Sequence, residues 1–371
     1  MSAVRVRRFP AALAAPLPVI LALSLGAYGA AQLPGASVAV TVAAGQVVLV
    51  IGAILAAGVA HDVAHWTVAH ALGFRVAKVT VGPFLVTLSR RGRFVDAARR
   101  WSQLRGEIVA EPRGERRAIL RWALVAAAGP AVSLGLAALA WRAMPVLAAV
   151  SLLRGLLALV PAGRLTAAPS DGARLLVFAG GGAAADRLTA LFRITAAQQA
   201  GMRPRAWPER WTIEASALRD GSRAEALGAV AAFRRALDGC AHDRAEGYLD
   251  RALALRALLP RAEACALLAD AAYFEARIHD DAVRARAWLE EAATRRSLCP
   301  VAERRAAAAV LLAAGDLAAG ALAVREALEQ LERVEREGHR ALPMESDWLR
   351  EMMARADCAS VLPPDLFAAA G

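Results

Sequence analysis

Three of the six histidines in this 371-residue chain, His61, His65 and His70, fall within ten positions of one another in an otherwise apolar stretch. A polar side chain is costly inside a membrane and is usually retained there for chemistry. His61 and His65 are four residues apart, so on a helix they share one face and their ring nitrogens can bind the same ion. His70 lies about half a turn off that face, which favours an interfacial position for it over a third ligand.

The residue after the first histidine determines what such a site could do. His61 and His65 have the spacing of the His-Glu-x-x-His signature of zinc metalloproteases, but Asp62 replaces the glutamate that acts as the general base. Aspartate has the same chemistry with one methylene less. A displacement of about 1 Å in a catalytic group can lower a rate on the order of a hundredfold, so the sequence leaves catalytic activity open.

Two histidines do not complete a catalytic zinc site, which usually has three protein ligands and a water. A third candidate is Asp171, which precedes Gly172 in a Pro/Gly-rich segment that should not form a plain helix. Irregular backbone near membrane depth is tolerated where it lines a cavity. Spacing alone favours a simple Asp-Gly turn over a metal ligand at this position.

The apolar residues, 57% of the chain, are unevenly distributed. Up to about Pro161 long charge-free runs alternate with one basic segment. After about Asp186 the sequence is an Ala/Leu/Arg/Glu mixture typical of soluble helices. We therefore predict a membrane-embedded domain over residues 1–182 and a cytosolic α-helical domain over residues 183–371.

The net charge of +11 comes almost wholly from arginine, since Lys78 is the only lysine. Nucleic-acid binding would require a basic face with aromatic residues or a known module, and the sequence contains neither. Basic residues also mark the cytoplasmic side of membrane proteins, and this explanation fits better. We predict no nucleic-acid partner and expect the lipid bilayer to be a partner instead.

A membrane-spanning helix needs about 20 apolar residues. Four segments qualify, at approximately 11–31, 43–72, 118–140 and 144–162. The loop between the second and third segments is dense in arginine, so the positive-inside rule places this loop and both termini on the cytoplasmic side. The first segment could instead be a cleaved signal peptide. We expect a multi-pass integral membrane protein.

Two further patterns concern the parts around these helices. Residues 76–81 and 84–88 are β-branched and flank Gly82-Pro83, which predicts a short β-hairpin. Such a hairpin could pair with an unwound substrate strand or could merely cover the domain.

The second half has a weak helical-hairpin repeat of the tetratricopeptide (TPR) type, and such arrays usually bind a peptide or partner protein. Its widely spaced cysteines should be reduced in the cytosol: Cys240, Cys265, Cys299 and Cys358.

Over roughly residues 45–180 the chain resembles the site-2 protease family of intramembrane zinc metalloproteases, because several motifs occur in the family's order. The His-x-x-x-His helix continues into small residues and Gly73, and Gly82-Pro83 is similar to the family's Gly-Pro turn. Two later segments are similar to the Ala-Gly-Pro-x-x-Asn and Asn-x-x-Pro…Asp-Gly motifs: Ala128-Gly129-Pro130 and Leu159-Val160-Pro161 with Asp171-Gly172. Ser133 and Ala158 stand where these motifs have asparagine.

The resemblance implies a zinc ion bound by His61, His65 and Asp171, with Asp62 as the general base. It also implies substrate-binding positions at four motif residues: Gly82, Pro83, Gly129 and Pro130. The substrate would be a locally unwound transmembrane segment of another protein, and the helical domain would recruit or gate it. Two alternatives remain: an inactive relative that acts as a binding or regulatory module, and a membrane-anchored scaffold whose helical domain carries the function.

Overall fold

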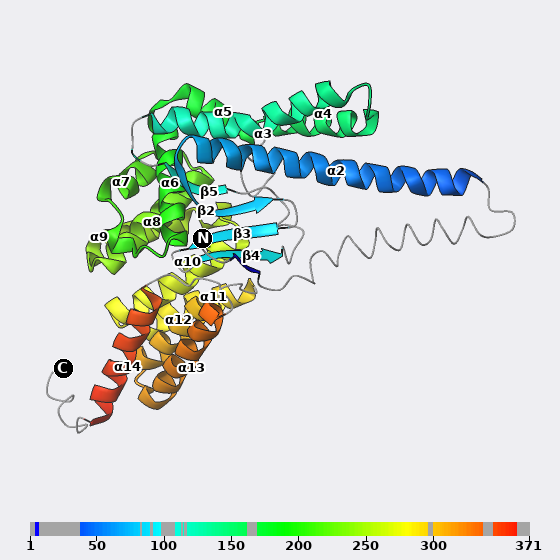
Figure 1. Ribbon diagram of the computed structural model, residues 1–371. Coiled ribbons are helices and arrows are strands. Elements are labelled where there is room, and N and C mark those ends of the chain that lie inside the picture. The colour runs from blue at the N-terminus through cyan, green and yellow to red at the C-terminus, as the bar shows by residue number, and fades with distance from the viewer. Residues whose placement is uncertain are drawn as a thin grey trace. The chain divides into compact units, whose positions relative to one another are not determined.

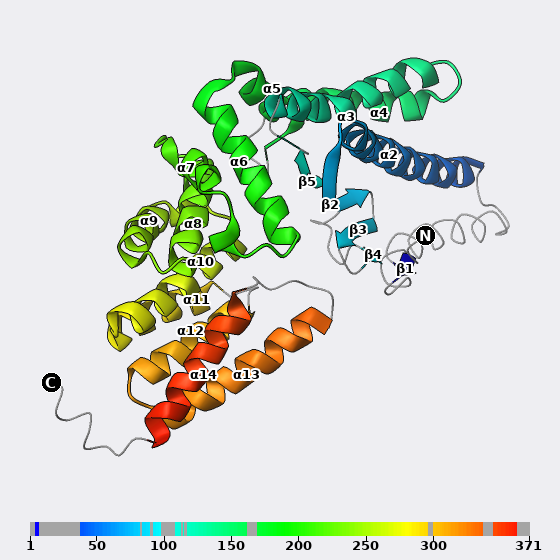
Figure 2. The ribbon, with the colours of Figure 1, turned by 60° about the vertical axis from the view of Figure 1, so that its left-hand side comes forward.

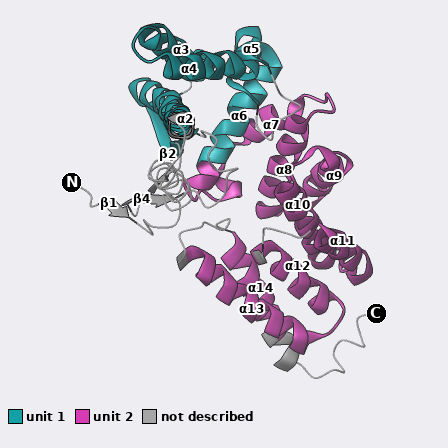
Figure 3. Ribbon diagram, turned by 90° about the vertical axis from the view of Figure 1, so that its right-hand side faces the viewer, with its two compact units in different colours: residues 1–196 teal, residues 197–371 magenta. Residues whose placement is uncertain are grey.

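The computed structural model describes residues 4–6, 38–81, 84–89, 92–97, 108–112, 114, 117–161, 169–295, 300–336 and 344–361. The described chain is mostly helical and contains one five-stranded sheet. Contacts divide it into two compact units, residues 1–196 and residues 197–371 (Figure 3).

Unit 1 is built around a long helix, α2 (Val38–Ala71), which packs between a helix pair and the sheet (Figure 1). The pair consists of α3 (Ala118–Ala140) and α4 (Pro145–Leu159). By length and composition, α2 and α3 can each cross a membrane, whereas α4 is apolar but has 15 residues. The helix predicted at 118–140 has the expected bounds, the fourth segment forms a shorter helix than predicted, and segment 11–31 lies outside the described residues.

A glycine joins α2 to the sheet. Gly73 follows the helix with φ of 77°, a left-handed conformation that glycine adopts without strain and that commonly ends helices. The chain enters strand β2 (Phe74–Val81) directly afterwards. The helix that carries the paired histidines is therefore tied closely to the sheet.

The sheet has the order β1-β4-β3-β2-β5 and is larger than the predicted hairpin. Strands β2 and β3 (Phe84–Ser89) pair antiparallel, with Val81 opposite Phe84, so the hairpin is confirmed, while its turn lies outside the described residues. The sequence predicts an all-α membrane protein of about four transmembrane helices with one short β-hairpin, and three further strands correct this fold class: β1 (Val4–Val6), β4 (Gly92–Ala97) and β5 (Ile108–Pro112). The last two are short and lie in the arginine-rich segment, where charged residues obscure the alternation of apolar side chains.

Unit 1 also includes most of α6 (Gly182–Gln199), which the sequence had placed in the second domain. An aromatic cluster explains this difference. The ring of Trp122 on α3 lies 4.7 Å from that of Phe74 and 4.5 Å from that of Phe192 on α6. Phe178 on α5 (Asp171–Gly180) belongs to the same buried cluster. These ring contacts hold α6 against α3 and β2.

Unit 2 is helical throughout its described residues, as predicted for this half of the chain. Successive helices pack in pairs, α8 with α9, α10 with α11 and α12 with α13 (Figure 2). Its helices are α7 (Glu209–Ala217), α8 (Arg223–Asp238), α9 (His242–Ala254), α10 (Arg261–Phe274), α11 (Ala282–Thr294), α12 (Pro300–Ala313), α13 (Leu317–Arg336) and α14 (Glu345–Val361). Shorter elements are the 3₁₀ turns η2 (Pro204–Ala206) and η3 (Arg256–Leu258) and a π-helical turn, η4 (Glu275–His279).

A buried arginine links three helices of unit 2. Arg305 on α12 is fully buried and donates hydrogen bonds to Asp270 on α10 (2.6 Å) and Glu345 on α14 (2.7 Å). Its guanidinium carbon lies 4.6 Å from the ring of Tyr273 and 4.9 Å from that of Trp348. Removing one partner from a buried charge network leaves the others uncompensated.

We expect Arg305→Ala to destabilise unit 2 by about 3–5 kcal/mol, because Glu345 would remain buried without its hydrogen-bonded cation and Asp270 would keep only Arg234, 3.0 Å away. The neighbouring Arg304, an exposed residue 3.9 Å from Glu326, is the matched control, and Arg304→Ala should stay within about 0.5 kcal/mol of wild type. Hydrogen exchange by mass spectrometry on the full chain would measure local opening in α10, α12 and α14. Equal protection in the two variants would contradict this account of the core.

Candidate metal centre

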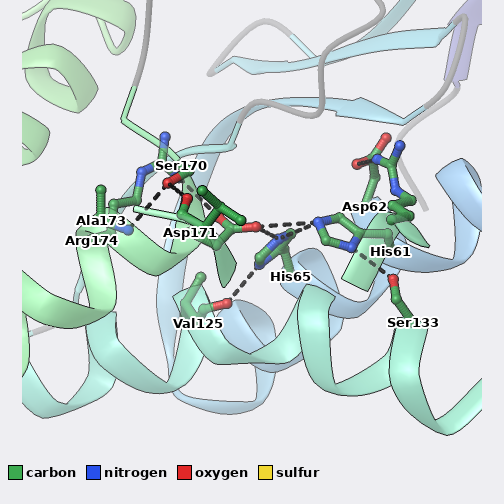
Figure 4. A network of polar contacts seen from close by, with 11 residues as sticks. His61, Asp62, His65, Val125, Ser133, Ser170, Asp171, Ala173 and Arg174 are labelled. Atoms are coloured by element: carbon green, nitrogen blue, oxygen red, sulfur yellow. Dashed lines mark hydrogen bonds and ion pairs between the residues drawn. The ribbon is translucent and has the colours of Figure 1, made fainter. Parts of the chain in front are cut away.

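Three side chains from two helices converge in unit 1 (Figure 4). One turn of α2 places His61 above His65, and the first residue of α5 is Asp171. His61 Nε2 lies 3.2 Å from Asp171 Oδ2, His65 Nε2 lies 3.2 Å from the same oxygen, and the two nitrogens are 3.2 Å apart. His70 is exposed in the last turn of α2 and is not part of this group.

The geometry of the three atoms fits a small tetrahedral metal ion. Around an ion with bonds of about 2.0–2.1 Å, the ligands of a tetrahedron are about 3.3–3.4 Å apart. The three observed separations of 3.2 Å form nearly one face of such a tetrahedron. The group can therefore hold a metal ion with one coordination position left open.

Hydrogen bonds of the two Nδ1 atoms orient the histidine rings so that their Nε2 atoms face the centre. His65 Nδ1 lies 2.6 Å from the carbonyl oxygen of Val125, and because a carbonyl can only accept, Nδ1 must carry the proton. Nε2 is then the His65 nitrogen that faces Asp171 and that can supply a lone pair to a metal ion. His61 Nδ1 makes a 2.9 Å hydrogen bond with Ser133 Oγ, which orients the second ring. Metal-binding histidines commonly have such outer partners.

Asp171 is positioned by a helix start, which corrects the irregular segment predicted for this region. The hydroxyl of Ser170 caps α5 by accepting from the Ala173 N–H (3.2 Å) and donates to the Val160 carbonyl at the end of α4 (2.7 Å). The segment between α4 and this cap lies outside the described residues. A serine N-cap after proline is a helix-start signal that outweighs the Asp-Gly turn.

The two oxygens of Asp171 face different partners. Oδ2 faces the histidines, and Oδ1 lies 3.7 Å from Arg174 Nη1. Burial by itself raises the pKa of Asp171, but hydrogen bonds with His61 and His65 outweigh it and bring the pKa well below its usual range. Asp171 is therefore a carboxylate, able to bind a cation through one oxygen.

Glycines allow the helices to approach this centre. A Cβ added at Gly129 on α3 would lie 2.3 Å from His65 Nε2 and 2.6 Å from His61 Nε2. A Cβ at Gly172 would lie 1.9 Å from the carbonyl oxygen of Leu159 on α4. Gly129 thus lies beside the histidine rings, and the Pro130 that follows it is buried. The other predicted substrate-binding residues, Gly82 and Pro83, lie outside the described residues.

Asp62 lies next to the triad and makes an ion pair with an arginine that sequence reasoning missed. Adjacent helix residues are rotated by about 100°, so Asp62 projects towards α4, where Arg154 Nη2 lies 3.3 Å from Oδ1. Asp62 is 3% exposed, and both residues line a cavity of about 90 Å³ together with the triad. The signal for Arg154 was available, because it is the only charged residue in α4.

Comparisons with protein-family models, with curated proteins and with solved structures found no match to this chain. The geometry of the described residues therefore carries the functional argument.

Gly129→Ala should abolish tight divalent-metal binding, because the new methyl group would occupy the space of the two Nε2 atoms. The loss should exceed the roughly 10–100-fold effect of removing an outer-shell partner. Gly135 on the same helix has no atom within 4 Å of an added Cβ, so Gly135→Ala is the matched control and should bind metal like wild type. Competition with a chelating dye measures both affinities, and wild-type affinity in Gly129→Ala would contradict the proposed geometry.

Proposed function

We propose that this chain is an intramembrane zinc metalloendopeptidase that cleaves a transmembrane segment of a substrate protein. The observation that carries the proposal is the convergence of His61 Nε2, His65 Nε2 and Asp171 Oδ2 at mutual distances of 3.2 Å. Two imidazoles and one carboxylate in a tetrahedral arrangement are a typical ligand set of catalytic zinc.

The residues around the ligands have separate roles in this proposal. A zinc ion bound here would act as a Lewis acid and lower the pKa of a water. Asp62 would accept a proton from the attacking water and transfer it to the amine nitrogen that leaves. Ser133 and the Val125 carbonyl would hold the rings of His61 and His65 in the binding orientation.

Membrane embedding is supported by the outward faces of the three apolar helices. So many exposed large apolar side chains on three neighbouring helices fit a lipid environment. Large apolar side chains more than a third exposed occur on α2 (Val47, Leu49, Val50, Ile54, Leu55), α3 (Leu120, Leu124, Val132, Leu139) and α4 (Leu152, Leu153, Leu156, Leu157). We propose a multi-pass arrangement of four spans with both termini cytoplasmic, following the distribution of arginine.

The sheet and the second unit supply ways to hold the substrate. Strand β5 is at one edge of the sheet, and Ile108 at its start lines the cavity with Thr80 of β2. An unwound substrate strand added to this edge would pass beside the triad. The paired helices of unit 2 support a TPR-like array that binds a partner protein or recruits substrate.

The ion pair between Asp62 and Arg154 favours a second candidate function, a non-catalytic relative that binds zinc and regulates other membrane proteins. An aspartate engaged by a guanidinium at 3.3 Å has part of its proton-accepting capacity already used. Zinc binding and proteolysis therefore need separate measurements.

Zinc content and cleavage, measured on the same purified variants, test both candidates. Wild type and His70→Ala, the exposed control on the same helix, should contain about one zinc per chain, as expected for a single three-ligand site. His65→Ala and Asp171→Ala should lose the zinc. Asp62→Asn should keep it while losing cleavage of co-expressed single-span membrane proteins.

These zinc and cleavage measurements distinguish the two proposed functions. Zinc retained by His65→Ala or Asp171→Ala would overturn the ligand set. Zinc in wild type without cleavage of any single-span protein would favour the regulatory alternative, and undiminished cleavage by Asp62→Asn would remove Asp62 from the mechanism.

A further inference from the structure

Arg154 and Trp122 both line the cavity beside the triad. Each has a buried hydrogen-bond donor, Arg154 Nε and Trp122 Nε1, that has no acceptor among the described residues. Trp122 is 5% exposed, and a buried polar atom without a partner is rare enough to require an explanation, often a bound molecule. Guanidinium and indole nitrogens can only donate. The complementary group must therefore be a hydrogen-bond acceptor, and in a peptide substrate the carbonyl oxygen is one.

Arg154 has donors to spare. It lies against α2, because a Cβ added at Gly58 would be 3.8 Å from its Nη1. Its Nη2 donates to Asp62 at 3.3 Å, whereas a guanidinium carries five N–H bonds. A lone arginine in an apolar helix such as α4 is by default a candidate functional residue, and Arg154 lines this cavity.

The charge of the cavity favours an anionic oxygen. Asp62 and Asp171 supply two negative charges, and Arg154 and Arg174 supply two positive ones. A divalent ion at the triad would make the sum +2. A preorganised positive site is the arrangement that stabilises negative charge developing in a transition state.

We propose that Arg154, with Trp122, binds the carbonyl oxygen of the scissile peptide bond as it becomes an oxyanion. This inference rests on the proposed function. The water oxygen bonds to the carbonyl carbon, and the π pair of the C=O bond moves to the carbonyl oxygen. The water proton passes to Asp62. The oxyanion then re-forms the C=O bond, the C–N bond breaks with its electron pair going to the nitrogen, and that nitrogen takes the proton from Asp62. Arg154 donates to the oxyanion and undergoes no covalent change.

The test uses methylphosphonate, a small tetrahedral anion, as the probe and the full-length Co²⁺-loaded protein in detergent. Visible absorption of the Co²⁺ reports anion binding without any turnover. Arg154→Ala should weaken methylphosphonate binding by roughly 10–100-fold, as expected for loss of a hydrogen bond to a charged group. Trp122→Phe should weaken it by about 2–10-fold. Arg142→Ala, an exposed arginine between α3 and α4, is the matched control and should bind like wild type.

The same measurement in the Asp62→Asn variant shows whether Arg154 binds the anion itself or only neutralises the charge of Asp62. In Asp62→Asn protein the carboxylate charge is gone, and the proposal predicts that adding Arg154→Ala still weakens binding by about tenfold or more. No effect of Arg154→Ala in that background, or an equal effect of Arg142→Ala, would overturn the inference alone. Failure of wild type to bind Co²⁺ would overturn the proposed function and this inference together.

Discussion

Three potential metal-ligand atoms face one another at 3.2 Å in unit 1: the Nε2 atoms of His61 and His65 and Oδ2 of Asp171. At such distances they repel one another unless positive charge lies among them. The Val125 carbonyl holds a proton of His65 on Nδ1 and so directs Nε2 inwards. A bound cation is therefore the simplest way to stabilise this arrangement.

The close packing of helices around these three atoms depends on two glycines. The α3 backbone lies against the imidazole rings because Gly129 has no side chain, and α5 lies against the end of α4 because Gly172 has none. Small residues that allow close helix contacts are typical of membrane proteins, where van der Waals packing and polar contacts hold helices together. The same close packing limits the cavity to about 90 Å³ and encloses Asp62.

Local patterns in the sequence predicted the elements better than the contacts between them. The α3 helix has its predicted bounds because an apolar run with Arg121 as its only charged residue is bordered by arginines, and the β2–β3 hairpin followed from β-branched residues around Gly-Pro. Asp171 and His61 are 110 positions apart, and spacing alone favoured a turn at Asp171. Only the order of motifs indicated a ligand there. Ser133 and Arg154 became visible as partners of His61 and Asp62 once the helices were placed.

X-ray absorption spectroscopy of the zinc-loaded full-length protein tests the central claim most directly, because it identifies the atoms bonded to the metal. The account predicts a first shell of nitrogen and oxygen only, at about 2.0–2.1 Å, with the outer-shell scattering of two imidazole rings. A sulfur shell near 2.3 Å, which would indicate cysteine ligands, or a spectrum without imidazole scattering would contradict it.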